Sequence, residues 1–391
     1  MLSQRLTRID FLTALVCCMI LTWTLSQTSF GQEAETLQQL QQKWTEIDAK
    51  LAAKENELKF AEGDTEQLQT EFKALVDEAN TLVKKLESTA KSKLESDPED
   101  SEAVRTLMGV MLNDAQFNRD ANVLELGDLL IANGVNPEYF NIASRSERLS
   151  IPAREIFDEL IIRHAEAMKG DLPRVKLSTT QGDVVIELYE NEAPNTVGNF
   201  ISLIEQGYYT DMIFHRVIEG FMAQGGGFKM EGDAEVGGEG PGYEIKCECD
   251  SPEKRLHFTN CLSMAHRGKD TGGSQFFLTF SRTSFLDGEH TCFGRVIEGQ
   301  DVLKKLARTH VSRPDGEEPI PGVTKDKIVS AEVLRKRDHA YAPDKVVPAD
   351  PEDNKNQESP TKTPENDAAD QKSDEDGNSN ESDEDQGQEK N

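Results

Sequence analysis

The sequence predicts a chain of several parts: a helical N-terminal region, an all-β domain and an acidic tail without fixed structure. Three observations support this division. An apolar heptad repeat runs from Leu37 to Leu86, apolar–polar alternation begins at Pro173, and large apolar residues nearly disappear beyond Arg337. Only 36% of the 391 residues are hydrophobic. Because a compact globular chain has roughly 45 to 50%, part of this chain lies outside a packed core.

The composition excludes several classes of function. The chain carries 43 Lys and Arg against 72 Asp and Glu, a net charge of −29. Such a surface repels phosphate backbones, so we expect no nucleic-acid partner. The seven histidines show no paired ligand spacing, and no phosphate-binding or dinucleotide fingerprint is present. We therefore expect no metal and no other cofactor.

Residues 1–31 are typical of a secretory signal. A basic flank, MLSQRLTR, precedes an apolar run from Ile9 to about Leu25, and small residues follow, which suits cleavage before Gln32. With tilt the run is nearly long enough to span a bilayer, so an uncleaved membrane anchor is the alternative. Both interpretations predict an exported protein of the periplasm or cell envelope.

Residues 32–98 are predicted to form a coiled coil or a helical hairpin. Apolar side chains alternate at spacings of three and four across residues 37–86, in a background of Gln, Glu and Lys. At Gly63 the motif GDTEQ resembles a helix stop followed by a new helix start. One long helix and an antiparallel hairpin both remain open, and a continuous seam over residues 37–86 allows a homo-oligomer.

Residues 99–171 continue as shorter helices of unknown role, and Pro98, Gly134 and Pro137 mark their starts and breaks.

Residues 172–337 are predicted to form the all-β domain. RVKLSTTQGDVVIELYE alternates on both sides of Gln181-Gly182, which is typical of two strands joined by a tight turn. Helical stretches occur only near 196–205 and 301–307. Beyond this domain, residues 338–391 are predicted to be an acidic disordered tail, because residues 351–391 alone carry 14 acidic and 4 basic side chains.

Three stretches of the β domain could carry chemistry. They read IFHRVIEGFMAQGGGF, LSMAHRGKDTGGSQFFLTF and SFLDGEHTCFGRV. On a strand, Arg216 shares parity with Met222 and Gln224, so one face would present a cation, an apolar wall and an amide together. Taken one at a time, each residue is more often part of a core or of a solvated face.

Together the three stretches resemble the signature of the cyclophilin family of peptidyl-prolyl cis-trans isomerases. FHRVIEGFMAQGGGF, TGGSQFF and FLDGEHTCFGRV match the family's segments in order and spacing, over about residues 172–337. The resemblance implies a closed eight-stranded antiparallel barrel with two capping helices. It also implies that the partners are proline-containing peptides and unfolded client proteins, with no cofactor.

The same resemblance assigns roles to individual residues. Arg216 is implied to be the catalytic arginine. The implied proline pocket consists of Phe221, Met222, Phe277 and Leu286, and the implied peptide groove of Gln224, Ala265, His266, Gln275, Phe285 and His290.

Two positions depart from the family pattern. His266 stands where many members have asparagine, and Phe285 stands where cyclosporin-sensitive members have tryptophan. We therefore expect activity without assured drug sensitivity.

The four cysteines of the domain fall into two pairs with different expected states. Cys261 and Cys292 replace aliphatic strand residues, so they are expected to be buried thiols. For Cys247 and Cys249, in KCECD, a disulfide and free thiols both remain open.

The predicted function is therefore a peptidyl-prolyl cis-trans isomerase that assists the folding of exported proteins. Two alternatives remain open: a binding module that holds prolyl segments without turnover, and an envelope scaffold in which the helices carry the main function.

Overall fold

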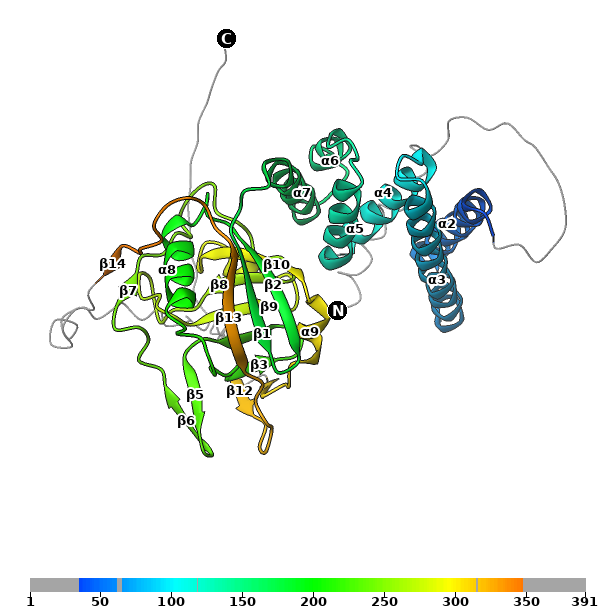
Figure 1. Cartoon of the computed structure of the whole chain (residues 1–391). Helices are drawn as coiled ribbons and strands as arrows, with labels where there is room; N and C mark the ends of the chain where they lie inside the picture. Colours follow the sequence, from blue (N-terminus) through cyan, green and yellow to red (C-terminus); the bar gives the residue numbers. More distant parts are fainter. Residues whose placement is uncertain (1–34, 62–64, 118, 314–315, 347–391) are drawn as a thin grey trace, which may run out of the picture. The chain divides into compact units, whose positions relative to one another are not determined.

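The computed structural model describes residues 35–61, 65–117, 119–313 and 316–346 (Figure 1). The predicted signal or anchor, and the tail from residue 347 onward, lie outside these residues. Within the described residues, no helix combines the length and apolar character that a membrane span needs. The helices before the β domain are α2 (Leu37–Phe60), α3 (Glu66–Ser96), α4 (Ser101–Gln116), α5 (Asp120–Ala132), α6 (Glu138–Ser144) and α7 (Ile151–Lys169).

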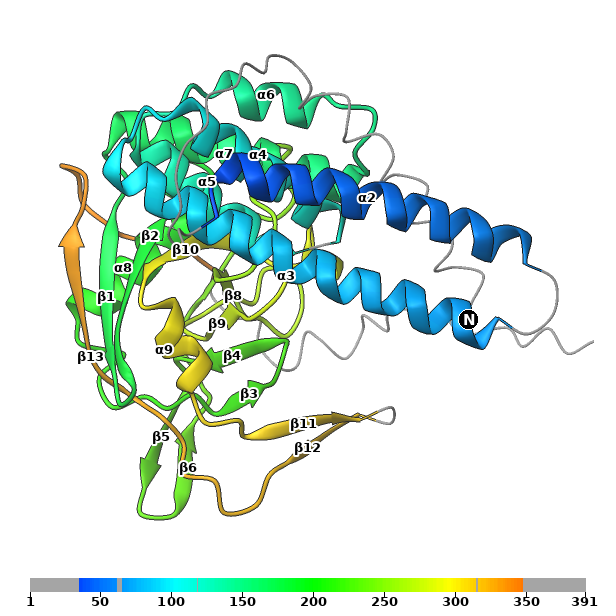
Figure 2. The ribbon, with the colours of Figure 1, turned by 90° about the vertical axis from the view of Figure 1, so that its right-hand side faces the viewer.

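Helices α2 and α3 form an antiparallel hairpin (Figure 2). Thr36 and Gln39 build a capping box at the start of α2. An ion pair between Lys54 and Glu71, at 2.9 Å, crosses between the two helices. The chain therefore doubles back instead of continuing as one helix.

The heptad positions are used within this single chain. Leu40 is fully buried on α2, and Leu82 and Leu86 are buried on α3. Because the seam is filled by the chain's own helices, the structure does not support the predicted homo-oligomer through residues 37–86, and an intermolecular coiled coil is not confirmed.

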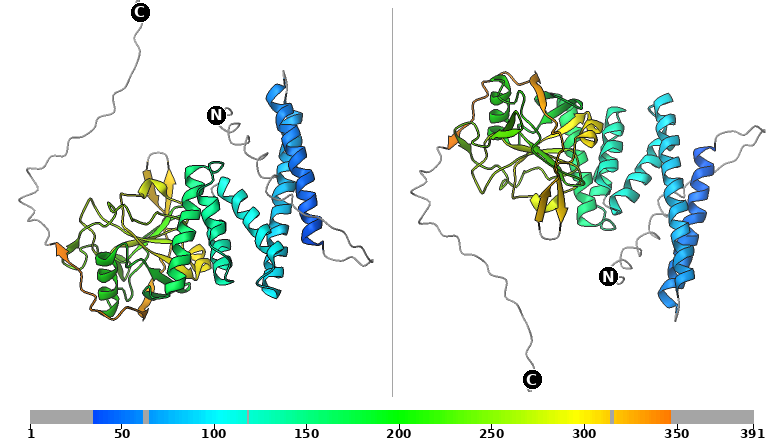
Figure 3. Two further views of the ribbon diagram at one scale, coloured as in Figure 1. Left: turned by 90° about the horizontal axis from the view of Figure 1, so that it is seen from above. Right: turned by 90° about the horizontal axis from the view of Figure 1, so that it is seen from below.

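Helices α3 to α7 continue as a packed series in which α4 packs on α3, α5 on α4, and α7 on both α5 and α6 (Figure 3). The Ser150 side chain caps α7 by accepting a hydrogen bond from the backbone N–H of Ala153, and Gly170 ends the helix with φ 63°. This left-handed residue turns the chain out of the helix just before the β domain begins.

The β domain is built on one ten-stranded sheet. Its order is β12-β11-β3-β4-β9-β8-β10-β2-β1-β13. The strands are β1 (Arg174–Thr179), β2 (Gly182–Leu188), β3 (Arg216–Ile218), β4 (Met222–Gly225), β5 (Phe228–Glu231), β6 (Ala234–Gly237), β7 (Glu244–Ile245), β8 (Cys261–Met264), β9 (Phe276–Thr279), β10 (Cys292–Glu298), β11 (His310–Arg313), β12 (Gly316–Pro319), β13 (Ile328–Arg335) and β14 (Lys345–Val346). Helices α8 (Pro194–Glu205) and α9 (Gln300–Lys305) lie close to the predicted helical stretches.

The expected closed eight-stranded barrel is not what the described residues form. Strands β12 and β13 are the edges of an open order. Where the sheet would close, a single bridge joins Ile213 to Lys327, and the N–H of Asp211 donates to the carbonyl of Ile328 at 2.8 Å. Asp211 has φ 63°, which takes the backbone out of the extended conformation. A continuous ladder therefore does not form at this point.

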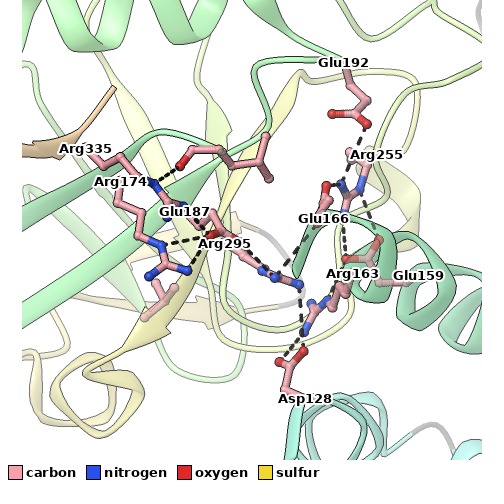
Figure 4. A network of polar contacts seen from close by, with 12 residues as sticks. Asp128, Glu159, Arg163, Glu166, Arg174, Glu187, Glu192, Arg255, Arg295 and Arg335 are labelled. Carbon is pink, nitrogen blue, oxygen red and sulfur yellow. Dashed lines mark hydrogen bonds and ion pairs between the residues drawn. The ribbon is translucent and has the colours of Figure 1, made fainter. Parts of the chain in front are cut away.

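Helix α7 is joined to the β domain by buried ion pairs (Figure 4). Arg255 donates to Glu159 at 2.7 Å and also contacts Glu166, both on α7. The hydrophobic core of the helices extends into the β domain to include Tyr189, Phe258, Cys261 and Cys292. The two cysteines are thus buried thiols, as predicted. The helices and the β domain therefore share one packed boundary.

The predicted boundary of the tail at residue 338 is wrong. Residues 338–346 pack on the β domain, where β14 pairs with β7. Tyr341 is 8% exposed and its hydroxyl donates to Glu190 at 2.9 Å. An aromatic side chain with a buried carboxylate partner, together with the pairing of β14, thus fixes a segment whose composition suggests no structure.

Candidate functional site

The site begins with a row of side chains across three neighbouring strands. Arg216 on β3 lies opposite Gln224 on β4, and Gln224 lies opposite Phe277 on β9. Residues directly opposite each other in a sheet project from the same face. The register therefore places the cation and the amide on one face, as the sequence pattern predicts, and adds the aromatic ring of Phe277.

An apolar pocket lies beside this row. Met222 and Phe277 are 1% and 5% exposed and form a small cluster with Ile218. The half-buried side chains Phe221, Ala265 and Leu286 pack against that cluster. The structure thus assembles all four residues predicted for the proline pocket, and adds Ile218.

The Arg216 guanidinium faces this pocket. Its Nη1 donates to Oε1 of Gln224 at 3.1 Å and contacts the sulfur of Met222 at 3.6 Å. Its Cζ lies 5.7 Å from the centre of the Phe221 ring. A fixed positive charge therefore stands at the edge of an apolar surface, which strengthens its field compared with that in water.

The other side of the guanidinium is held by a carboxylate that the sequence reasoning missed. Glu317, on β12, accepts from Nε of Arg216 at 2.6 Å and also contacts Nη2. This hydrogen bond lowers the pKa of Glu317, which therefore stays ionised at neutral pH. In a chain with 72 acidic residues, nothing in the motif DGEEP marks one carboxylate as special.

Beyond Gln224 the surface opens into a polar cleft of about 270 Å³. Nε2 of Gln224 donates to Oε1 of Gln275 at 3.0 Å, which continues the polar chain that starts at Arg216. The cleft is also lined by Ala265 and His266. A cleft of this volume can hold an amino-acid side chain.

His266 and His290 stack on each other with ring centroids 4.0 Å apart. Nδ1 of His290 donates to the carbonyl of Met264 at 3.0 Å. Burial lowers the pKa of His290, so its ring is neutral at neutral pH. The His290 ring is also perpendicular to that of Phe277, with the ring centroids 5.5 Å apart, so the histidine pair packs beside the apolar pocket.

Phe285 is the most exposed predicted site residue, at 67%. It lies on the short helix η3 (Ser284–Leu286), with its ring 5.7 Å from that of Phe221. It therefore stands at the open rim of the pocket, not in its wall.

A buried triad behind the pocket was also missed by the sequence reasoning. His257 is fully buried, with Nδ1 at 2.9 Å from Asp287 and Nε2 at 2.8 Å from the hydroxyl of Ser263. Its ring stacks on Phe277 at 6.0 Å. These contacts fix the ring of Phe277 and the loop that follows η3. The position of Asp287 inside FLDGEH is the only sequence signal for them.

Comparisons with known proteins identify the domain. The family model described as cyclophilin type peptidyl-prolyl cis-trans isomerase/CLD matches residues 174–333. A peptidyl-prolyl cis-trans isomerase of Helicobacter pylori (strain ATCC 700392 / 26695) is 47% identical over 148 residues, 37% of this chain and 85% of the relative. Peptidyl-prolyl cis-trans isomerase B of Bacillus subtilis (strain 168) is 44% identical over 130 residues, 33% of this chain and 87% of the relative.

A solved structure is also similar. The crystal structure of a Cryptosporidium parvum cyclophilin type peptidyl-prolyl cis-trans isomerase is 30% identical, with a TM-score of 0.34, and the match covers 42% of this chain and 99% of that one. On the relatives and the family model, this chain belongs to the cyclophilin-type peptidyl-prolyl cis-trans isomerases. The family match does not extend to helices α2 to α7.

Proposed function

We propose that the groove around Arg216 catalyses rotation about Xaa-Pro bonds in exported proteins and so assists their folding in the periplasm or cell envelope. The observation that supports the catalytic part is the placement of one guanidinium at the edge of an apolar pocket built from Met222, Phe277 and Leu286. Membership of the isomerase family supports the same reaction.

The chemistry of the prolyl bond explains why such a site suffices. Rotation loses amide resonance and faces a barrier of roughly 18 to 20 kcal/mol, yet no covalent bond is made or broken. At the half-turned state the prolyl nitrogen becomes pyramidal and gains a lone pair. A donor aimed at this nitrogen stabilises the transition state but not the planar ground state. Arg216 is the donor that the site provides.

One donor does not account for the whole acceleration. A charge-assisted hydrogen bond contributes roughly 1.5 to 3 kcal/mol, which corresponds to one or two powers of ten in rate. The pocket would supply the rest, because Phe277 and Met222 hold the proline ring while the preceding carbonyl swings, and because they exclude water that favours the planar, charge-separated amide. An arginine keeps its charge in such a partly apolar place, where a lysine loses it more easily.

The proposal that the protein is exported rests on the sequence of residues 1–31. A basic start, an apolar run and small residues before Gln32 support a secretory signal, and an uncleaved anchor remains the alternative. Mass spectrometry of the mature protein, together with cell fractionation, tests this. An N-terminus at Gln32 in a soluble envelope fraction supports a cleaved signal, intact protein in the membrane fraction supports the anchor, and intact cytosolic protein contradicts both.

A second candidate function is a binding module that holds prolyl segments without turnover. One observation favours it: Glu317 already engages two of the N–H groups of Arg216. The two functions make different predictions for exchange in a tetrapeptide that contains proline. The isomerase requires the full chain to raise the exchange rate in proportion to its concentration. Peptide binding with uncatalysed exchange would reject the enzyme and support the module.

A further inference from the structure

Two cysteines lie behind the wall of the polar cleft. After β7 the chain runs through Cys247 and Cys249 alongside the loop of residues 266–273. The N–H of Ile245 donates to the carbonyl of Gly272 at 2.8 Å, which joins the two segments. His266, Arg267 and Thr271 of this loop line the cleft. Any change of size at the cysteines therefore presses on a wall of the peptide groove.

Cys247 is tied to this loop by a reciprocal pair of hydrogen bonds. Its sulfur accepts from the N–H of Asp270 at 3.2 Å, and its own N–H donates to Oδ1 of Asp270 at 2.8 Å. Asp270 has φ 63°, an uncommon conformation for a residue other than glycine. The backbone thus holds an N–H group against the sulfur at some cost in strain, as is common at functional positions.

The chemical surroundings of Cys247 favour a thiolate. Burial by itself raises the pKa of the thiol, but hydrogen bonds with His266 and with the N–H of Asp270 outweigh it and lower the pKa below its usual range. The hydrogen bond with Cys247 likewise raises the pKa of His266. A thiol beside a protonatable histidine and a backbone donor is the usual setting of a reactive cysteine.

Cys249 has the opposite character. It is 4% exposed and burial raises its pKa to about 11, so it remains a thiol. Cys247, two residues away in the sequence, also raises the pKa of Cys249. Both are free thiols in the structure. The pair thus combines a sulfur that can attack a disulfide, that of Cys247, with a second sulfur, that of Cys249, that can displace the group then bound to Cys247.

We propose that Cys247 is a site of reversible thiol–disulfide exchange with low-molecular-weight disulfides, and that its oxidation weakens peptide binding in the adjacent cleft. The Cys247 thiolate attacks one sulfur of the small disulfide, whose S–S bond breaks, and one small thiolate leaves. Cys249 then loses its proton to water and attacks the sulfur of Cys247. The second small thiolate leaves, and a Cys247–Cys249 disulfide remains. The two electrons pass to the small disulfide, which is reduced to two thiols.

The thiol chemistry stands apart from the catalytic role of the groove, whereas its effect on peptide exchange rests on the proposed function. The first experiment therefore does not use activity. The full chain is treated with oxidised glutathione, digested and mapped by mass spectrometry, and alkylation by iodoacetamide is followed as a function of pH. Cys247 should react at least tenfold faster than Cys261 or Cys292 at pH 7. Cys249→Ser should accumulate glutathione on Cys247, while the wild type proceeds to the internal disulfide.

The second experiment measures isomerase kinetics before and after oxidation. In the wild type we expect KM for the peptide to rise at least threefold with kcat nearly unchanged, and dithiothreitol should reverse the rise. Cys247→Ser should be insensitive to oxidation. Reaction at Cys247 no faster than at the buried cysteines overturns the proposed site. An equal change of KM in Cys247→Ser overturns the link to the cleft, and a chain that lacks isomerase activity altogether fails the proposed function without affecting the mapping result.

Discussion

Two arginines in this chain have similar partners and opposite roles. Arg255 and Arg216 each pair with glutamate, and each lies over an aromatic ring, Tyr189 at 3.7 Å and Phe221 at 5.7 Å. Their side chains differ in exposure, 1% for Arg255 and 30% for Arg216. Burial therefore decides the role of each arginine: a fully enclosed guanidinium holds the structure together, and a half-open one can act on a substrate.

The surroundings of Arg255 show what full enclosure requires. Glu159 bridges Arg255 and Arg163, and Arg295 approaches Glu187 at 2.9 Å in the same network (Figure 4). Burial by itself raises the pKa of Glu159, but Arg255 and Arg163 outweigh it and lower the pKa to about 2. Each charge in the network is thus balanced by a neighbour. Arg216 has one carboxylate partner and an open side, which leaves room for a peptide.

The largest effect is expected from Arg255→Met. Removal of Arg255 takes from Glu166 its nearest cation and leaves Glu159 with Arg163 alone. Loss of one member of such a buried network costs roughly 3 to 5 kcal/mol of unfolding free energy. Urea unfolding followed by circular dichroism measures the loss. Arg313→Met is the matched control, because Arg313 pairs with Glu318 on the surface and is 53% exposed; it should cost at most about 1 kcal/mol. Equal losses of unfolding free energy in the two variants would mean that burial does not decide how much an arginine contributes to stability.

The second largest effect is a loss of stability in acid, which we expect from His215, the residue before Arg216. Burial lowers the pKa of His215 to about 4; its ring packs at a tilt against that of Phe228, with the ring centroids 4.7 Å apart. As pH falls below ~6.5, His215 therefore takes up a proton in the unfolded chain before it does so in the folded one. Stability is intact above that pH and decreases toward about 4, by on the order of 2 kcal/mol at pH 4.5. Glu159 acts in a lower window, because its contribution is lost only as pH falls from ~4.5 toward 2.

Unfolding free energies of two variants between pH 7 and 4.5 isolate His215. His215→Gln should flatten the slope. His339→Gln should not, because a hydrogen bond with the carbonyl of Ala340 and another with Glu190 raise the pKa of His339. A raised histidine pKa gives stability that is lost as pH rises, which is the opposite direction. An unchanged slope in His215→Gln would assign the acid sensitivity to other groups.

Arg216→Ala is expected to lower kcat/KM by at least about tenfold, or ~1.4 kcal/mol of transition-state stabilisation. Its unfolding free energy should change by at most about 0.5 kcal/mol, since the side chain is partly exposed. Arg216→Lys keeps the charge but not the planar fork, and should recover only part of the rate. The peptide exchange assay decides the matter: full activity in Arg216→Ala would remove the arginine from catalysis.

The same comparison shows which features can be predicted from a sequence. The parity of Arg216, Gln224 and Met222 along short strands predicts a shared face, and the register confirms it. Local alternation also predicts the hairpin at Gly182. Pairings between distant segments leave no such pattern. Arg255 meets Glu159 across 96 positions of sequence, and Arg216 meets Glu317 across 101. In an acidic chain, neither carboxylate differs from its many neighbours until the fold brings it to an arginine.

The smallest effect tests whether Glu317 restrains Arg216 or aims it. Glu317→Gln keeps an oxygen acceptor near the guanidinium but removes the negative charge that opposes its action on the prolyl nitrogen. We expect kcat/KM to rise about two- to fivefold, less than 1 kcal/mol, because a charge-assisted bond is replaced by a weaker neutral one. Glu318→Gln is the control, since Glu318 pairs with Arg313 instead, and it should leave the rate unchanged. A fall in rate for Glu317→Gln alone would mean that the carboxylate holds the guanidinium in its working orientation. The half-open arginine would then depend on its partner for direction, as the enclosed Arg255 does.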